Sequence, residues 1–152
     1  MFDEINQKRQ QIYELYRQSL QPLEEAQLLR MPRIPEDCVS NHHMFYILLP
    51  SRAVRDGLMA HLKQQQISAV FHYIPLHSSP VGQSWGFQQG DLPVTEHCAE
   101  CLLRLPFYYE LTPEEQLRVI SEIEIFLTSL VCQSLLPESL QVKNDSGPLD
   151  TP

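Results

Sequence analysis

The segment 72–77 reads HYIPLH and places His72, Tyr73 and His77 around Pro75. It directly follows the strand-like run 68–71, and its proline fixes φ and offers no backbone N–H. Loops at strand ends often hold side chains that contact ligands, because a rigid scaffold positions them while leaving them accessible. An isolated pattern of this kind is more often a strand end with partly exposed rings. The functional interpretation therefore depends on the rest of the chain.

The remaining histidines and the cysteines do not form a metal-binding pattern. Cys98 and Cys101 make a C-x-x-C pair, but a zinc knuckle needs a second pair, and the other two cysteines stand singly. The pair falls inside a predicted helix, which favours packing over thiol chemistry. His42 and His43 are adjacent, so on an extended chain they point to opposite sides and cannot both face one metal ion. One of them could face a ligand.

Composition excludes several classes of protein. The chain has 152 residues, 43% of them hydrophobic, which suits one globular domain or part of a larger one. A net charge of −8 argues against a nucleic-acid surface, and no apolar run is long enough to span a membrane. The first residues are charged rather than a secretory signal, and four cysteines are too few for a disulfide framework. A cytoplasmic location is expected. The five glycines form no phosphate-binding loop.

Helical and extended segments alternate along the chain. We predict helices over 3–20, 51–65, 95–103 and 112–130, and extended segments over 28–34, 44–49, 67–74 and 104–107. Pro22 marks the end region of the first helix, and Ser51 caps the second. Thr112 and Glu115 form a capping box around Pro113 at the start of the last helix. The expected inner faces are Val54, Leu58, Met59 and Leu62 in the second helix and Leu117, Ile120, Ile123, Leu127 and Leu130 in the last.

This order predicts an α+β fold (an α/β sandwich), with a small, mostly antiparallel sheet and helices on one face. The domain is expected over 1–132, and the polar segment 133–152 is expected to be a disordered tail. The first helix begins at the very start of the chain, so we expect it to pack on a further domain. An exposed apolar stripe that includes Ile5, Ile12 or Tyr16 would then follow.

Four motifs in order carry a family resemblance: HMFYILL at 43–49, AVFHYIPLH at 69–77, LLRLPFY at 102–108 and LTPEEQ at 111–116. Over about residues 2–130 the chain resembles the C-terminal portion of the DegT/DnrJ/StrS family of nucleotide-sugar aminotransferases. The resemblance implies the C-terminal small domain of the aspartate-aminotransferase fold and a homodimer. It also implies pyridoxal phosphate as cofactor, glutamate as amino donor and a nucleotide-linked keto-sugar as substrate.

By this resemblance the loop after the second strand lines the nucleotide-sugar pocket. His72, Tyr73 and His77 are its expected substrate-binding residues, since imidazole and phenol groups suit diphosphate oxygens and sugar hydroxyls. Asn41 and His43, just before the first strand, are weaker candidates. Which histidine contacts which substrate atom is left open.

The chain departs from the family in lacking its cofactor-binding half. Family members carry the Schiff-base lysine, an aspartate for the pyridine nitrogen and a phosphate cradle on a large N-terminal domain. The three lysines here, Lys8, Lys63 and Lys143, stand in polar surroundings unsuited to that role. We therefore expect no catalytic residue, no bound cofactor and no activity in this chain alone. Two classes stay open: part of a sugar aminotransferase that packs on a lysine-bearing domain, or a non-catalytic α+β binding or dimerisation module.

Overall fold

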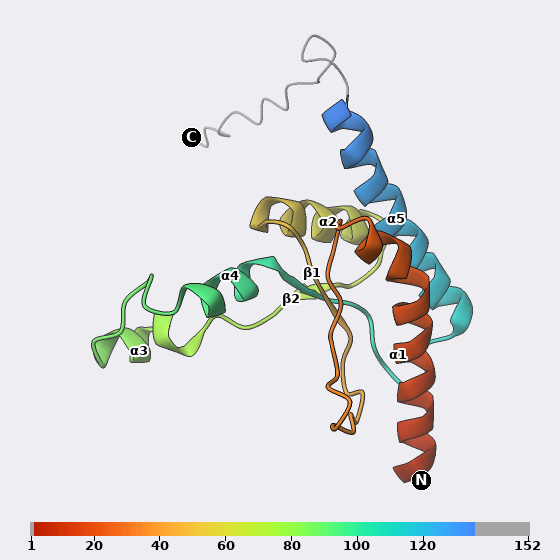
Figure 1. Ribbon diagram of the computed structural model, residues 1–152, viewed down its shortest axis with the longest axis horizontal. Coiled ribbons are helices and arrows are strands. Elements are labelled where there is room, and N and C mark those ends of the chain that lie inside the picture. The colour runs from red at the N-terminus through yellow and green to blue at the C-terminus, as the bar shows by residue number, and fades with distance from the viewer. Residues whose placement is uncertain (1, 136–152) are drawn as a thin grey trace, which may run out of the picture.

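The computed structural model describes residues 2–135 and shows the predicted alternation of helices and strands. Figure 1 shows α1 and α5 side by side along one flank, with α3 far out on the opposite side. In chain order the elements are α1 (Phe2–Glu25), β1 (Tyr46–Leu48), α2 (Arg52–Gln64), β2 (Val70–Phe71), the 3₁₀ turn η1 (Leu76–Ser78), α3 (Pro80–Ser84), α4 (Pro93–Cys101), β3 (Leu102–Arg104) and α5 (Pro113–Leu135).

The three strands form one antiparallel sheet in the order β1-β3-β2. Leu103 of β3 pairs with Ile47 on one side and with Phe71 on the other. The predicted helix 95–103 was therefore wrong at both ends. It begins at Pro93 and stops at Cys101, because residues 102–104 pair as the central strand. The predicted strands 44–49 and 67–74 are shorter than expected, since β3 offers only three residues as pairing partners.

Helices cover one face of this sheet, as predicted. Ile47 and Leu103 are fully buried on that face. Tyr46 and Arg104, which pair with each other, alternate to the opposite face and are only half-buried. The predicted extended segment 28–34 contributes one bridge, in which Arg30 and Leu48 exchange hydrogen bonds of 2.9 and 2.8 Å.

The helices α2 and α5 begin where their caps predict. Ser51 accepts a hydrogen bond from the backbone N–H of Val54, and Leu58 and Leu62 are fully buried. At the start of α5, the hydroxyl of Thr112 accepts the Glu115 N–H at 3.2 Å, and the Glu115 carboxylate accepts the Thr112 N–H at 3.0 Å. Both caps are confirmed.

The buried stripe of α5 differs from the prediction at one position. Leu117 is 51% exposed, whereas Gln116 is 2% exposed and its amide donates to the carbonyl of Ile12 at 2.6 Å. Position 117 lies about 100° around the helix from 116, so both cannot face α1. The other predicted positions lie inward: Ile120, Ile123 and Leu127 are buried and Leu130 is half-buried.

The first helix runs past Pro22 to Glu25, which corrects the predicted end at residue 20. Proline lacks an N–H, but its carbonyl still accepts the N–H of Ala26 at 3.0 Å, and Leu23 is buried in the core. The exposed stripe expected on this helix was wrong at Ile12 and Tyr16, which are 3% and 0% exposed. They pack against other parts of this chain. In the first turns, Phe2 is 84% exposed and Ile5 is half-buried.

The C-terminal part of the domain prediction is tested only in part. α5 continues to Leu135, so residues 133–135, predicted as tail, belong to the last helix. The rest of the predicted disordered tail, 136–152, lies outside the described residues. Between residues 2 and 135, no helix combines the length and the apolar character needed to cross a membrane.

Candidate functional site

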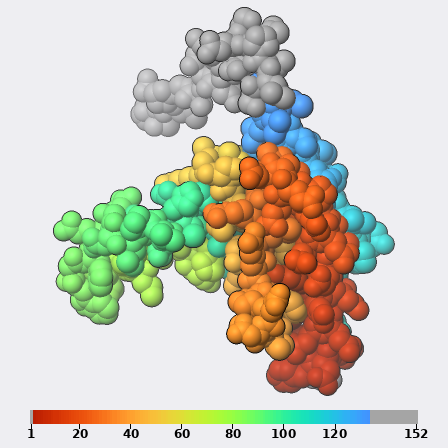
Figure 2. Space-filling model, in the orientation of Figure 1, coloured from red at the N-terminus to blue at the C-terminus, as the bar shows by residue number. Residues whose placement is uncertain are grey.

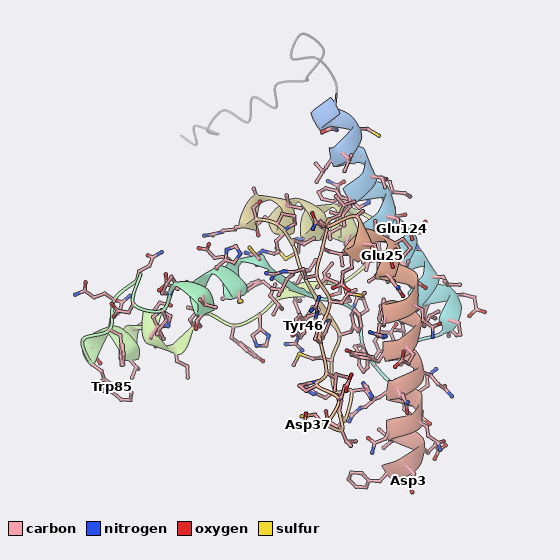
Figure 3. All side chains as sticks on the ribbon, viewed as in Figure 1. Asp3, Glu25, Asp37, Tyr46, Trp85 and Glu124 are labelled. Carbon is pink, nitrogen blue, oxygen red and sulfur yellow. The ribbon has the colours of Figure 1, made fainter. Side chains whose placement is uncertain are left out.

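The HYIPLH segment leaves the sheet at β2 and begins an arm, which we define as residues 72–92. Figure 2 shows this arm, in green, standing out from the body of the molecule, and Figure 3 shows Trp85 at its tip. Within the arm, the hydroxyl of Ser79 caps α3 by accepting the N–H of Gly82 at 3.2 Å. A side chain at Gly82 would clash with the carbonyl oxygens of Leu76 and His77, so close packing of α3 on η1 requires glycine there.

His77 is buried and holds the arm to α4. Its Nε2 lies 2.8 Å from Oε1 of Glu96, and the same oxygen accepts the backbone N–H of Gly90 at 2.7 Å. The hydrogen bond from His77, and next the one from Gly90, lower the pKa of the Glu96 carboxyl below its ordinary value. His77 therefore shapes the loop, and this ring nitrogen is already engaged.

His72 and Tyr73 line a cavity of about 510 Å³, which we call the arm pocket. The Nδ1 atom of His72 is buried there without a hydrogen-bond partner. Tyr73 is 75% exposed, and its ring meets that of His72 edge-on at 5.3 Å between centroids. The pocket lies between α2, the start of the arm and α4; its other lining residues are Arg52, Arg55, Asp56, Met59, Phe71, Ile74, Pro75, Ser78, Gln89, Glu96, Ala99 and Glu100.

Arg55 is the member of this pocket that the sequence prediction missed. It is 6% exposed, and its guanidinium carbon lies 5.4 Å from the centroid of the Phe71 ring. Positions 55, 58 and 62 share the three- and four-residue spacing of one helix face. This spacing is the feature of the sequence that could have placed Arg55 on the buried face of α2. A charged residue on a helix is usually solvated, so only aliphatic residues were assigned to the inner face.

His43 lies at a second, separate cavity, and Asn41 contacts His43 without lining that cavity. Nδ1 of His43 lies 2.9 Å from Oδ1 of Asn41. His43 lines a cavity of about 440 Å³ with residues from the start of α1 and from 107–109, which we call the helix-end pocket. The extended backbone expected at 42–43 is wrong at His42, which has a φ of 45° and packs its ring 4.5 Å from that of Tyr13.

The sheet register separates these two groups of residues. β1 and β2 both run antiparallel to β3, so His43, before β1, and His72, after β2, lie toward opposite ends of it. When the two registers are extended, His43 faces position 107, beyond the end of β3, and His72 faces position 102. These positions are roughly 17 Å of extended chain apart. One copy of this chain brings His72 and Tyr73 together at the arm pocket, whose lining does not include His77, and leaves Asn41 and His43 elsewhere.

The C-x-x-C pair lies in α4, as predicted. Cys98 is half-buried and Cys101, the last residue of the helix, is 2% exposed. Burial raises the pKa of the Cys101 thiol, which disfavours the reactive thiolate. Across residues 2–135 no group of three histidine, cysteine or carboxylate side chains is arranged to hold a metal ion.

The described lysines do not fit a Schiff base with pyridoxal phosphate. Such a lysine needs a desolvated pocket, but Lys63 is exposed and Lys8 is only half-buried. Neither lines the arm pocket or the helix-end pocket. Lys143 lies outside the described residues. Neither described lysine therefore has the desolvated surroundings that a Schiff base requires.

Comparisons with known proteins show which family this sequence and this fold resemble. The sequence model of the DegT/DnrJ/EryC1/StrS aminotransferase family matches residues 1–124. The chain is 37% identical over 93 residues to a "pleiotropic regulatory protein" of Geobacillus stearothermophilus, covering 60% of this chain and 25% of the relative. It is 29% identical over 124 residues to dTDP-3-amino-3,4,6-trideoxy-alpha-D-glucose transaminase of Micromonospora megalomicea, covering 80% and 32%.

A solved structure is similar over the same part. The aminotransferase TlmJ of Streptoalloteichus hindustanus matches with a TM-score of 0.69 and 28% identity, over 82% of this chain and 32% of that one. The chain thus spans between a quarter and a third of the length of these relatives.

Proposed function

This chain belongs to the DegT/DnrJ/EryC1/StrS aminotransferase family, and on that premise we propose that it serves as the C-terminal small domain of a sugar aminotransferase. The complete enzyme would transfer an amino group from glutamate to a dTDP-4-keto-6-deoxy-hexose. The four motifs resemble dTDP-4-amino-4,6-dideoxygalactose transaminase, which serves synthesis of a bacterial surface polysaccharide, enterobacterial common antigen. The observation that carries the proposal is the arm pocket, which gathers His72 and Tyr73 of the HYIPLH motif at one cavity.

In this proposal the chain supplies one wall of the substrate site. Pyridoxal phosphate supplies the electron-accepting chemistry when it is bound by the lysine-bearing domain that family members carry. Tyr73 offers an accessible phenol to polar groups of the nucleotide sugar, and the His72 ring lines the same pocket beside it. His77 acts by fixing the loop through Glu96.

Asn41 and His43 have a different place in this proposal. Because they lie toward the other end of β3, they would contact another part of the substrate or a second subunit. A homodimer could bring the helix-end pocket of one subunit toward the arm pocket of its partner.

The test joins this chain to the lysine-bearing domain of a family enzyme and measures nucleotide-sugar affinity and cofactor loading separately. His72→Ala, Tyr73→Phe and His77→Ala should each weaken nucleotide-sugar binding about 10- to 150-fold, the scale of one hydrogen bond to a charged group. Cofactor loading should stay unchanged. Lys63→Gln, at an exposed position outside the arm pocket, is the matched control.

The competing interpretation makes these residues packing groups at a strand end. The same substitutions would then lower the melting temperature and leave the affinity of the folded protein unchanged. That pair of results would remove the substrate-binding assignment.

A further inference from the structure

Cys98 and Cys101 lie three residues apart in the last turn of α4, and neither lines the arm pocket. In an α-helix this spacing places two Cα atoms about 5 Å apart, within the range of roughly 4.4–6.8 Å that a disulfide spans. The corresponding Cβ atoms are about 5–6 Å apart, whereas a disulfide needs about 4 Å. The two sulfur atoms can therefore be joined only if the last turn changes its shape.

The two thiols differ in their access to solvent. Cys98 is half-buried, whereas Cys101 is 2% exposed and burial raises the pKa of its thiol. Thiol–disulfide exchange begins with attack by an accessible thiolate, and a second thiol nearby then completes it. The ring nitrogens of His97 lie 3.8 and 3.9 Å from the Cys101 sulfur, so this ring can accept the proton that Cys101 loses. Cys98 is thus placed as the attacking thiol and Cys101 as the resolving thiol.

Backbone hydrogen bonds show which end of this turn can move. The carbonyl of Cys101 accepts the N–H of Leu49 at 3.0 Å, and the next residue, Leu102, begins the central strand β3. The carbonyl of Cys98 accepts the Leu102 N–H, which closes the last turn of α4. Because the sheet fixes Cys101, a bond between the sulfur atoms must draw in Cys98 and break the hydrogen bond from Leu102.

We propose that Cys98 and Cys101 form a thiol–disulfide switch that reshapes one wall of the arm pocket. Ala99 and Glu100 lie between the two cysteines and line that pocket, so unwinding the last turn moves both side chains. A disulfide held in strained geometry is easily reduced again, which makes the change reversible. The proposal does not depend on sugar amination.

The oxidant in this reaction is a small disulfide such as oxidised glutathione. Cys98 loses its proton to water, and its thiolate attacks one glutathione sulfur, so that the glutathione S–S bond breaks and one glutathione thiolate leaves. Cys101 loses its proton to His97, and its sulfur attacks the Cys98 sulfur and displaces the second glutathione. The cysteine pair is oxidised by two electrons. The glutathione disulfide takes up these electrons and two protons and becomes two thiols.

The experiment uses the 152-residue protein with Cys38→Ser and Cys132→Ser, because both of these cysteines are exposed and would react on their own. The folded protein is incubated with oxidised glutathione, and its mass is measured without reduction. It should lose two hydrogen atoms and retain no glutathione, and peptide mapping should place the new bond between residues 98 and 101. Dithiothreitol should restore the original mass.

Two further substitutions in that protein separate the roles of the two thiols. Cys101→Ser should stop at a mixed disulfide, with one glutathione on Cys98. Cys98→Ser should react at least about tenfold more slowly than Cys101→Ser, because its remaining thiol is 2% exposed and reacts only when the turn opens.

Hydrogen exchange of the Leu102 amide measures the change of shape. It should be at least about tenfold faster in the oxidised than in the reduced protein, since the amide loses its acceptor. The amide of Leu105, which donates within the sheet at 3.1 Å, is the control and should change less than about twofold. The backbone NMR signals of Ala99 and Glu100 should shift on oxidation and return on reduction.

Three results would overturn the proposal. The first is a folded protein that stays reduced in excess oxidised glutathione or that keeps a glutathione on Cys98. The second is a Cys98→Ser protein that reacts as fast as Cys101→Ser; if Cys101→Ser does not fold, the rate of Cys98→Ser is compared with that of the intact pair. The third is an oxidised protein with unchanged Leu102 exchange and unchanged signals of Ala99 and Glu100, because the disulfide would then leave the arm pocket as it was.

Discussion

Nε2 of His77 and Oε1 of Glu96 lie 2.8 Å apart, although 19 residues separate them in the chain. His77 belongs to η1 at the start of the arm, and Glu96 to the first turn of α4 beyond its end. Because Glu96 also accepts the N–H of Gly90, one carboxylate holds the arm at two points. The shape of the arm pocket therefore depends on this one side chain.

Replacing that carboxylate should loosen the arm without unfolding the domain. Glu96→Gln keeps the size of the side chain but removes its charge, which weakens both hydrogen bonds. Hydrogen exchange of the Gly90 amide and its neighbours in 76–92 should become faster, while exchange in α5 should not change. Glu100→Gln, which removes only an exposed contact of 3.9 Å with Arg52, is the control. Equal exchange in both variants would show that the pair does not hold the arm.

The contact between His77 and Glu96 also predicts that the stability of the arm depends on pH. The pKa of Glu96 is lowered in the folded state, chiefly by its hydrogen bond with His77, so the folded protein binds that proton less readily than the unfolded chain does. Its contribution to stability is then complete above the ordinary glutamate pKa of about 4.3 and is lost as the pH falls through the lowered value. Arm exchange should therefore rise on acidification below about pH 4. In Glu96→Gln this rise should be absent.

Local signals predicted the helix starts well, because each involves groups only three residues apart. The hydroxyls of Ser51 and Thr112 accept from Val54 and Glu115, as their sequence positions indicate. The central strand could not be found in this way. Residues 102 and 103 continue the predicted helical pattern, although 104 was predicted to be extended. Only pairing of Leu103 with Ile47 and Phe71, each more than 30 residues away, places them in β3.

The sequence predicted only part of the candidate site, because local patterns do not reveal long-range contacts. The HYIPLH motif is contiguous in sequence, so His72 and Tyr73 could be assigned to one place before the fold was known. Arg55 precedes that motif by a whole helix. Its burial depends on the side chain of Phe71 and on the surroundings of the arm pocket, which are contributed by distant segments and which no local pattern reveals.

The helical register of α5 can be tested with two neighbouring residues. Gln116 is buried and donates to the Ile12 carbonyl, whereas Leu117 is 51% exposed. Gln116→Leu should lower the free energy of unfolding by about 0.5–1.5 kcal/mol, because it removes this side-chain hydrogen bond to a carbonyl that keeps its partner within α1. Leu117→Gln should change it by less than about 0.5 kcal/mol. Urea unfolding measures both. If Leu117→Gln instead lowered the free energy of unfolding more than Gln116→Leu, Leu117 rather than Gln116 would occupy the buried position.

The contact between Tyr16 and Pro106 joins α1 to the segment after the sheet, across 90 residues of sequence. The phenol donates to the Pro106 carbonyl at 3.0 Å, and the fully buried ring stacks on Phe45 at 5.1 Å. Tyr16→Phe keeps the ring and removes the donor, so unfolding should become easier by about 0.5–1.5 kcal/mol. Tyr109→Phe removes a hydroxyl whose partner, Glu4, lies 3.4 Å away at an exposed position, and should cost less than about 0.5 kcal/mol. Thermal unfolding should therefore show a loss of a few degrees for the first variant alone. Equal melting temperatures for the two variants would mean that the Tyr16 hydroxyl does not help to fix α1 to the domain.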